Sequence, residues 1–177
     1  MRAVVVFESM FGNTQKIAAA IGEGLGDRMA VDVVEVGAAP TEIGPGTDLL
    51  VVGGPTHAFG MSRPQTRQDA ARQAGGEVVS RSGIREWLES VTHEAPVPAV
   101  AFDTRVSKGW VPGSAARAAQ RRLRGKRFGA AADPETFYVE GTPGPLLDGE
   151  LARARQWGAD LAASVGAEGT GTREESR

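Results

Sequence analysis

The sequence predicts an α/β protein with a doubly wound parallel sheet covered by helices on both faces, and three observations lead to this. Apolar runs with the length of strands alternate along the chain with helical patterns. The run Asp48–Gly53 has an unbroken apolar centre, which suits a strand buried between two helical layers. The first apolar run ends in a polar, glycine-containing turn that opens a helix. Together these features predict a three-layer arrangement.

The first half of the chain supplies three of the expected strands. Ala3–Phe7 forms the first, and Val31–Val36 the second. Between them a helix begins at Gln15, because Ile17, Ile21 and Leu25 fall on one helical face. Residues 37–46 contain two prolines and three glycines, so any helix there is short. Asp48–Gly53 is the third strand.

The second half repeats the pattern. Apolar residues recur at helical spacing from Ile84 to Val91, and Trp87 lies within that stripe, so we expect it in the core. Val97–Phe102 is the fourth strand, and a further helix follows around residues 116–123. Residues 128–131 and 137–139 form a split fifth strand, and the last helix has its apolar stripe between residues 151 and 165.

Composition narrows the class of protein. A chain of 177 residues can form one domain, which we place at residues 1–165 with a polar, disordered tail at 166–177. The net charge of −2 gives no general attraction to nucleic acid. The absence of cysteine excludes disulfides, thiol nucleophiles and cysteine-bound metals. No apolar run is long enough to span a membrane, so we expect a cytoplasmic protein.

The turn after the first strand is a candidate anion site. It reads Ser9-Met10-Phe11-Gly12-Asn13-Thr14 and ends at a helix N-terminus, where unpaired N–H groups and the helix dipole favour an anion. It lacks the lysine of a Walker A loop and the spacing of a dinucleotide fingerprint. The turn contains no Lys or Arg, which suits a phosphate monoester on a resident cofactor. An ordinary strand-to-helix turn without a ligand is the alternative.

Two further loops should converge on this turn, because ligands of such sheets bind beyond the carboxyl ends of the strands. They span residues 54–64 and 103–113, and both are long. Each carries an aromatic side chain, Phe59 in one and Trp110 in the other. Backbone polar groups with aromatic side chains suit the edge and the faces of a flat aromatic ligand.

On these residues the chain resembles the flavodoxin family. The turn Ser9-x-x-Gly12-Asn13-Thr14 resembles that family's T-x-T-G-x-T phosphate loop. Residues 51–56 resemble the strand and loop that lead under the flavin ring, and residues 144–151 resemble the run into the last helix. The resemblance covers roughly residues 2–165. It implies a flavodoxin-like fold with five parallel strands in the order 2-1-3-4-5, and non-covalent FMN.

The resemblance also implies which residues bind the cofactor. The phosphate would be held by Ser9, Met10, Phe11, Gly12, Asn13 and Thr14. The isoalloxazine ring would be flanked by two sets of residues: Pro55, Thr56, His57, Ala58, Phe59 and Gly60, and Asp103, Thr104, Arg105 and Trp110. Met10 and Phe11 replace small polar residues of the family pattern, so they would bind through their backbone N–H groups.

Some features depart from the family pattern. The chain is nearly neutral, whereas electron-shuttle flavodoxins are strongly acidic, and the ring-flanking loops lack a tyrosine. An arginine-bearing insertion, residues 62–83, separates the third strand from the fourth. No pair of carboxylates with spacing for acid–base catalysis is identifiable.

Several candidates have alternative interpretations. His57 is either a donor to flavin or substrate, or a solvated loop residue. Phe59 and Trp110 either stack on the ring or pack their loops against the domain. Arg105 either offsets negative charge on reduced flavin, binds a substrate carboxylate, or forms a salt bridge with Asp103 or Glu140.

A basic run lies near the C-terminal half of the fold. Arg117, Arg121, Arg122, Arg124, Lys126 and Arg127 fall within eleven residues, and no acid occurs from Lys108 to Ala132. Without interleaved aromatics it does not indicate nucleic-acid binding. It is either a solvated helix face or a docking site for an acidic redox partner or a phosphorylated nicotinamide cofactor.

The sequence therefore favours an FMN-binding redox protein. It would exchange electrons with a redox partner protein or a small-molecule acceptor, or it would reduce quinone-like acceptors as an FMN-dependent oxidoreductase. The alternative is a binding or regulatory module that keeps the fold but has lost FMN.

Overall fold

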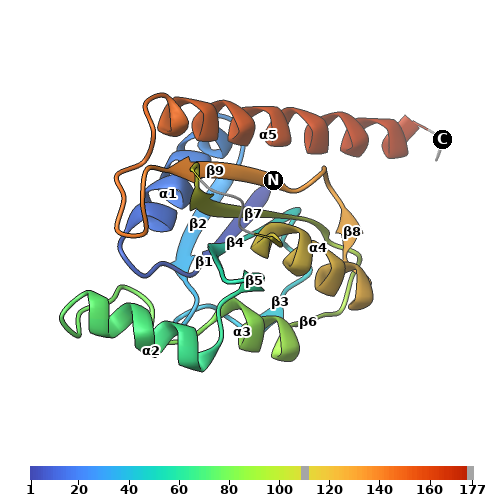
Figure 1. The fold of residues 1–177 in the computed structure, drawn as a ribbon. Coiled ribbons are helices and arrows are strands. Elements are labelled where there is room, and N and C mark those ends of the chain that lie inside the picture. Colours follow the sequence, from blue (N-terminus) through green and yellow to red (C-terminus); the bar gives the residue numbers. More distant parts are fainter. Residues whose placement is uncertain (109–111, 175–177) are drawn as a thin grey trace.

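The computed structural model describes residues 1–108 and 112–174. The strands and helices alternate along the chain (Figure 1). The strands are β1 (Arg2–Phe7), β2 (Ala30–Glu35), β3 (Glu42–Ile43), β4 (Leu49–His57), β5 (Gly60–Met61), β6 (Thr92–His93), β7 (Pro98–Val106), β8 (Gly129–Ala130) and β9 (Glu135–Val139). The helices are α1 (Asn13–Gly26), α2 (Pro64–Gln73), α3 (Ile84–Ser90), α4 (Ala115–Gly125) and α5 (Glu150–Glu174).

The main sheet is parallel and has the order β2-β1-β4-β7-β8. Both β8 and β9 pair with β7, so the fifth strand is split, as the sequence predicts. This order confirms the predicted 2-1-3-4-5 arrangement and the doubly wound α/β class. A short antiparallel hairpin joins β4 to β5 at the carboxyl edge of the sheet, and β3 pairs with β6 away from it.

The core consists of two clusters on opposite faces of the sheet. Alternate residues of β1 point to opposite faces, as a pleated strand requires. Val4 and Val6 pack with α3 and α4, while Ala3, Val5 and Phe7 pack with α1 and α5. Trp87 is buried in the first cluster, which confirms the expectation from its helical stripe.

Glycine permits close packing of α1 against α5. A Cβ on Gly24 would lie 1.9 Å from the backbone oxygen of Arg155, and one on Gly158 would lie 2.3 Å from that of Ile21. Since backbone atoms cannot move aside like a flexible side chain, both positions require glycine. Gly24, near the C-terminus of α1, therefore permits the close contact with α5.

Two segments differ from the simple alternation. The insertion at residues 62–83 contains helix α2, which the sequence pattern did not indicate. Helix α5 extends to Glu174 and so enters the segment expected to be a disordered tail. The domain limit at residue 165 stays a prediction. No helix in the described ranges is both long and apolar enough to cross a bilayer.

Candidate functional site

The turn between β1 and α1 depends on Gly12. This residue has φ of 89° and occupies the N-cap position of α1, a left-handed conformation that favours glycine. The side-chain oxygen of Ser9 accepts a hydrogen bond from the Gly12 N–H at 3.1 Å. The turn is also fixed from behind, because Ser9 and Ser80 exchange two hydrogen bonds of 2.9 and 2.8 Å. Its backbone is therefore shaped before any ligand arrives.

Helix α1 starts without a side-chain cap. Within the described part of the chain, no partner is found for a series of backbone N–H groups along the turn and first helical turn. These belong to Met10, Phe11, Asn13, Thr14 and Gln15. Unpaired N–H groups at a helix N-terminus, joined to the positive end of the helix dipole, suit an anion.

Side chains around the turn hold it to neighbouring loops. The hydroxyls of Thr14 and Thr104 lie 2.7 Å apart and join the start of α1 to β7. The Asn13 amide donates to the Pro143 carbonyl at 3.1 Å, which joins the same turn to the loop before α5. The Met10 side chain is buried.

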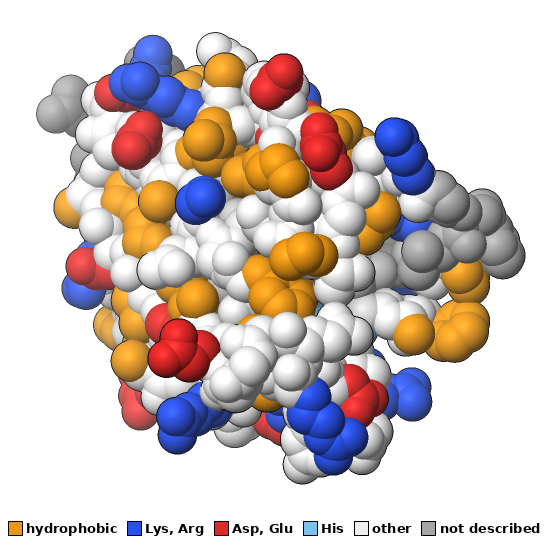
Figure 2. Space-filling view, turned by 60° about the vertical axis from the view of Figure 1, so that its left-hand side comes forward, with side chains coloured by type: hydrophobic (Ala, Val, Ile, Leu, Met, Phe, Trp, Pro, Cys, Tyr) orange, Lys and Arg blue, Asp and Glu red, His pale blue; other side chains and the backbone are white. Residues whose placement is uncertain are grey.

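A cavity of about 410 Å³ opens beside this turn, at the carboxyl ends of β1, β4 and β7. This volume lies within the usual range for small-molecule sites, roughly 300–1,000 Å³. Figure 2 shows the face that lies at the left of Figure 1; apolar side chains gather in its middle and charged ones lie mainly around them. The cavity is lined by Ser9, Met10, Phe11, Asn13, Thr14, Pro55, Thr56, His57, Ala58, Thr66, Asp69, Ala70, Gln73, Thr104, Arg105, Val106, Val139 and Thr142.

Most residues expected from the sequence therefore reach one cavity, but some do not. Gly12 caps α1 beside the cavity, and Gly60 and Phe59 line a separate hollow beyond the hairpin. Phe59 is 74% exposed, with φ of 70°, at the hairpin tip. Trp110 lies outside the described residues.

Asp103 lies behind the cavity rather than in it. It is fully buried, and its Oδ2 accepts hydrogen bonds from Thr56 Oγ1 at 2.8 Å, Ser114 Oγ at 2.7 Å and the Ala116 N–H at 3.0 Å. The carboxylate thus caps the N-terminus of α4 and fixes Thr56, which lines the cavity. Asp103 positions the ring-side loop and does not contact the cavity space itself.

One wall of the cavity was missed by sequence reasoning. It comes from α2, which contributes Thr66, Asp69, Ala70 and Gln73. These positions follow the spacing i, i+3, i+4, i+7 and so share one helical face. That face is small and polar rather than apolar, so a search for hydrophobic periodicity passes over it. The spacing and Pro64 at the first helical position were the available signals.

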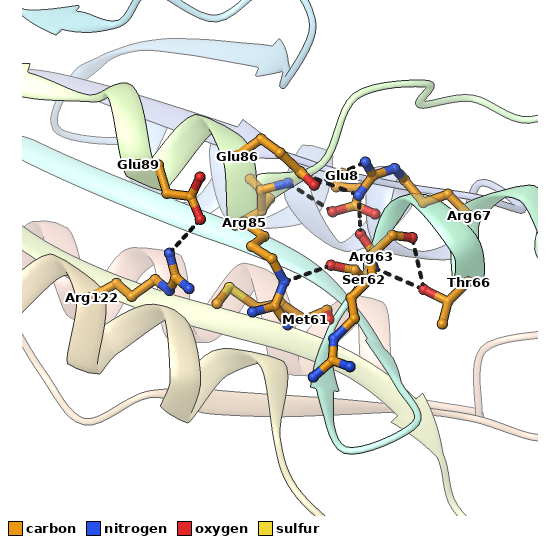
Figure 3. Close-up of polar contacts among 11 residues, drawn as sticks. Glu8, Met61, Ser62, Arg63, Thr66, Arg67, Arg85, Glu86, Glu89 and Arg122 are labelled. Atoms are coloured by element: carbon orange, nitrogen blue, oxygen red, sulfur yellow. Dashed lines mark hydrogen bonds and ion pairs between the residues drawn. The ribbon is translucent and has the colours of Figure 1, made fainter.

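A polar cluster, mostly buried, joins β1, α2 and α3 (Figure 3). Arg67 Nη1 donates to Ser62 Oγ at 2.9 Å, and its guanidinium makes two hydrogen bonds to the Glu86 carboxylate, of 3.2 and 3.1 Å. The Glu8 carboxylate accepts a hydrogen bond from the Ile84 N–H at 2.8 Å. Its second oxygen, Oε1, is buried without a partner.

Burial changes the acidity of two groups here. It raises the pKa of the Glu8 carboxyl above its ordinary value, while the Ser62 hydroxyl, the Ile84 N–H and the Arg67 charge act in the opposite direction. Burial, with the nearby Arg67 charge, lowers the pKa of His57. A neutral imidazole therefore faces the cavity at pH 7. In the described ranges no group of His, Asp and Glu side chains is arranged to hold a metal ion.

The fold and the candidate site define a class of protein: a doubly wound α/β protein with a candidate anion site at its first strand-to-helix turn. A family model described as flavodoxin matches residues 5–77, which include that turn. No match was found among curated proteins. The solved structures share the fold over almost the whole chain.

Three solved structures illustrate this likeness. A flavodoxin from the domain Archaea is 18% identical, with a TM-score of 0.61, and the match covers 93% of this chain and 99% of that one. Oxidised flavodoxin 1 from Bacillus cereus is 15% identical, with a TM-score of 0.64 and coverage of 92% and 98%. The flavodiiron protein from Giardia intestinalis is 19% identical, with a TM-score of 0.59; the match covers 94% of this chain but only 36% of that protein.

The match to the flavodoxin model over residues 5–77 and the likeness to the solved structures show that this chain has a flavodoxin-like fold. The resemblance seen in the sequence is confirmed at the level of the fold. Since these identities are low, the solved structures establish the fold, and the cofactor and its chemistry depend on the site.

Proposed function

We propose that this protein binds FMN non-covalently and transfers electrons between redox partners. The observation that carries the proposal is the uncapped start of α1, whose unpaired N–H groups border the cavity. An anion with several oxygens satisfies these donors together, and the phosphate of FMN is such a group. When bound, FMN supplies the electron-transfer chemistry.

The residues present fit this cofactor at both ends. The N–H groups of the first turn and the Thr14 hydroxyl would hold the phosphate. Residues 55–58, Thr104 and Arg105 also line the cavity and would flank the ring. Residues 59, 60 and 103 would act indirectly, through the shape of the hairpin and of the loop before α4. A ring contact by Trp110 stays a prediction.

The cavity also bears on the kind of redox reaction. His57 and the α2 side chains Asp69 and Gln73 lie at its walls, so a small acceptor would meet polar groups beside the ring. We therefore include the reduction of quinone-like acceptors in the proposal, beside transfer to a partner protein. The alternative, a module of this fold without FMN, is tested by the same titration.

The test compares FMN with riboflavin, which lacks the phosphate. Apoprotein should quench FMN fluorescence with one-to-one stoichiometry and bind riboflavin much more weakly. Two matched variants probe the turn, since Gly12→Asp adds a carboxylate beside the phosphate and Gly12→Asn adds a neutral side chain of similar shape. A charge at roughly 4 Å in a partly buried site costs about 4 kcal/mol, so Gly12→Asp should weaken FMN at least about 100-fold.

The two variants share the backbone change at a left-handed position, which Asn and Asp both tolerate better than most residues. Gly12→Asn should therefore keep most of the affinity. No quenching at micromolar FMN would refute the cofactor proposal. Equal affinity for FMN and riboflavin would place the phosphate away from the turn.

A further inference from the structure

A second hollow lies on the far side of the β4–β5 hairpin from the cavity. It has a volume of about 360 Å³ and is lined by Phe59, Gly60, Met61, Arg63, Arg85, Ala118, Arg121 and Arg122. The hairpin separates the two spaces, because Thr56, His57 and Ala58 line the first and the next three residues line the second. Nothing in the proposed FMN site uses this hollow.

The arginines come from separate elements. Arg63 precedes α2, Arg85 lies on α3, and Arg121 and Arg122 lie on α4. Arg122 pairs with Glu89 at 3.0 Å, across two exposed side chains. In the described ranges no carboxylate pairs with Arg63 or Arg121. The hollow therefore has an excess of positive charge that the protein itself leaves unneutralised.

Two backbone carbonyls hold the Arg85 side chain in place (Figure 3). Its Nε donates to the Ser62 carbonyl at 3.0 Å and its Nη2 to the Met61 carbonyl at 2.8 Å. Both acceptors are neutral, so the guanidinium keeps its charge uncompensated by an ion pair. Partial burial lowers its pKa, and the neighbouring Arg122 and Arg63 act in the same direction, while Glu86 and Glu89 act against them. An anion bound among these side chains would relieve this repulsion.

The shape of the site distinguishes between possible anions. A folded acidic protein presents a broad, convex surface, whereas these guanidinium groups surround a hollow of small-molecule size. Guanidinium groups bind phosphate oxygens in pairs of hydrogen bonds, and several of them suit adjacent phosphates. The exposed ring of Phe59 stands at the edge and offers a face for an aromatic base.

We propose that the hollow formed by Arg63, Arg85, Arg121 and Arg122 beside Phe59 is a binding site for a nucleoside diphosphate or a ligand containing one. The diphosphate lies among the guanidinium groups, and the base stacks on Phe59. This site is separate from the proposed FMN cavity and does not depend on FMN binding.

Isothermal titration with ADP and with inorganic pyrophosphate tests the site. The protein is used with FMN present, so that phosphate cannot enter the first cavity, and the Gly12→Asp variant is tested in parallel. ADP should bind at one site in both, more tightly than pyrophosphate, and more weakly at 200 mM than at 50 mM NaCl. If the Gly12→Asp variant still binds ADP, the ADP site is distinct from the FMN turn, whatever the outcome of the FMN titration.

Two double variants with equal loss of charge localise the binding. Arg63→Gln with Arg121→Gln removes the unpaired cations of the hollow, and should weaken ADP about 100-fold, about tenfold for each charge-assisted contact. Arg117→Gln with Arg124→Gln removes exposed cations of α4 that do not line the hollow. This control should change the affinity less than about threefold. Phe59→Ser should abolish the preference of the protein for ADP over pyrophosphate.

Three outcomes would overturn the proposal. They are no ADP binding at 1 mM, an equal loss in both double variants, or equal affinity for ADP and pyrophosphate in the unmodified protein. A plant-type ferredoxin, an acidic protein, serves as the competing probe. If ferredoxin binds and neither phosphate compound does, the surface is a protein-docking site instead.

Discussion

Glu8 immediately precedes the proposed phosphate turn and is 1% exposed. Its Oε2 accepts a hydrogen bond from the Ile84 N–H, and its Oε1 is left without a partner. A carboxylate in this position is costly, because burial removes water without full replacement of its hydrogen bonds. Arg67 compensates part of this cost through its charge. The residue therefore links stability to pH.

The direction of this linkage can be worked out. The pKa of Glu8 is raised in the folded protein, so with rising pH the unfolded chain loses its proton first, near pH 4.3. The folded protein then holds more protons, and the free energy of unfolding falls until pH exceeds the folded pKa. Glu8→Gln should remove this fall. In urea unfolding at pH 4.5, 6, 7.5 and 9, the free energy of unfolding of the variant should rise relative to that of the unmodified protein as pH increases.

The exposed Glu77 provides the control for this measurement, since Glu77→Gln removes one carboxylate without changing the buried cluster. A difference between Glu8→Gln and the unmodified protein that stays constant from pH 4.5 to 9 would contradict the prediction.

Helices α1 and α5 pack closely against each other, and glycine makes this contact possible. Gly24→Ala would place a Cβ 1.9 Å from the Arg155 carbonyl oxygen, so the helices must separate. Overpacking of this kind costs about 1–3 kcal/mol. Gly26→Ala is the matched control, since nothing lies within 4 Å of its Cβ and alanine favours the helix by up to about 1 kcal/mol. Urea unfolding should therefore show opposite effects for the two substitutions, and equal effects would mean that this contact is loose.

Helix α2 determines how much space the cavity offers. Ala70 is buried and lines the cavity, whereas Ala71 on the same helix does not line it. Ala70→Leu should fill part of the cavity and weaken FMN at least about tenfold, a loss of about 1.4 kcal/mol. Ala71→Leu, with the same change in size, should leave the affinity within about twofold. Fluorescence titration measures both, and equal affinities would remove α2 from the proposed binding site.

The predictability of these elements from sequence follows from their physical environment. Strands β1 and β4 are buried on both faces, so their continuous apolar runs identify them. Helix α2 buries little apart from Ala70 and the paired Arg67, so it has no apolar stripe to detect. The turn at Gly12 is formed by residues adjacent in the sequence, so its position between the first strand and the first helix could be predicted. The role of Asp103 depends on Thr56 and Ser114, contacts between separate segments that a sequence pattern does not contain.

Across the whole molecule, charge is unevenly placed in a way that the net value of −2 hides. Arginines of three elements surround the hollow, while the proposed phosphate turn contains no basic residue. The two proposed anion sites thus differ in their physical basis: backbone dipoles on one side of the β4–β5 hairpin and guanidinium charges on the other. Salt should weaken the second more than the first, because exposed charges are screened more than buried dipoles.

Cofactor binding should stabilise the protein as a whole, because a ligand that binds only the folded state adds its binding free energy to the free energy of unfolding. At an FMN concentration 100 times the measured Kd, the gain is about 2.7 kcal/mol. For a domain of this size, 1 kcal/mol shifts Tm by about 2–4 °C, so FMN should raise Tm by about 5–11 °C. Gly12→Asn should show a similar shift at 100 times its own Kd, while Gly12→Asp should show almost none at the concentration used for the unmodified protein. Differential scanning calorimetry with and without FMN measures these shifts, and riboflavin at the same concentration controls for the ring alone. An unmodified protein whose Tm does not respond to FMN would favour the alternative of a module that keeps this fold without the cofactor.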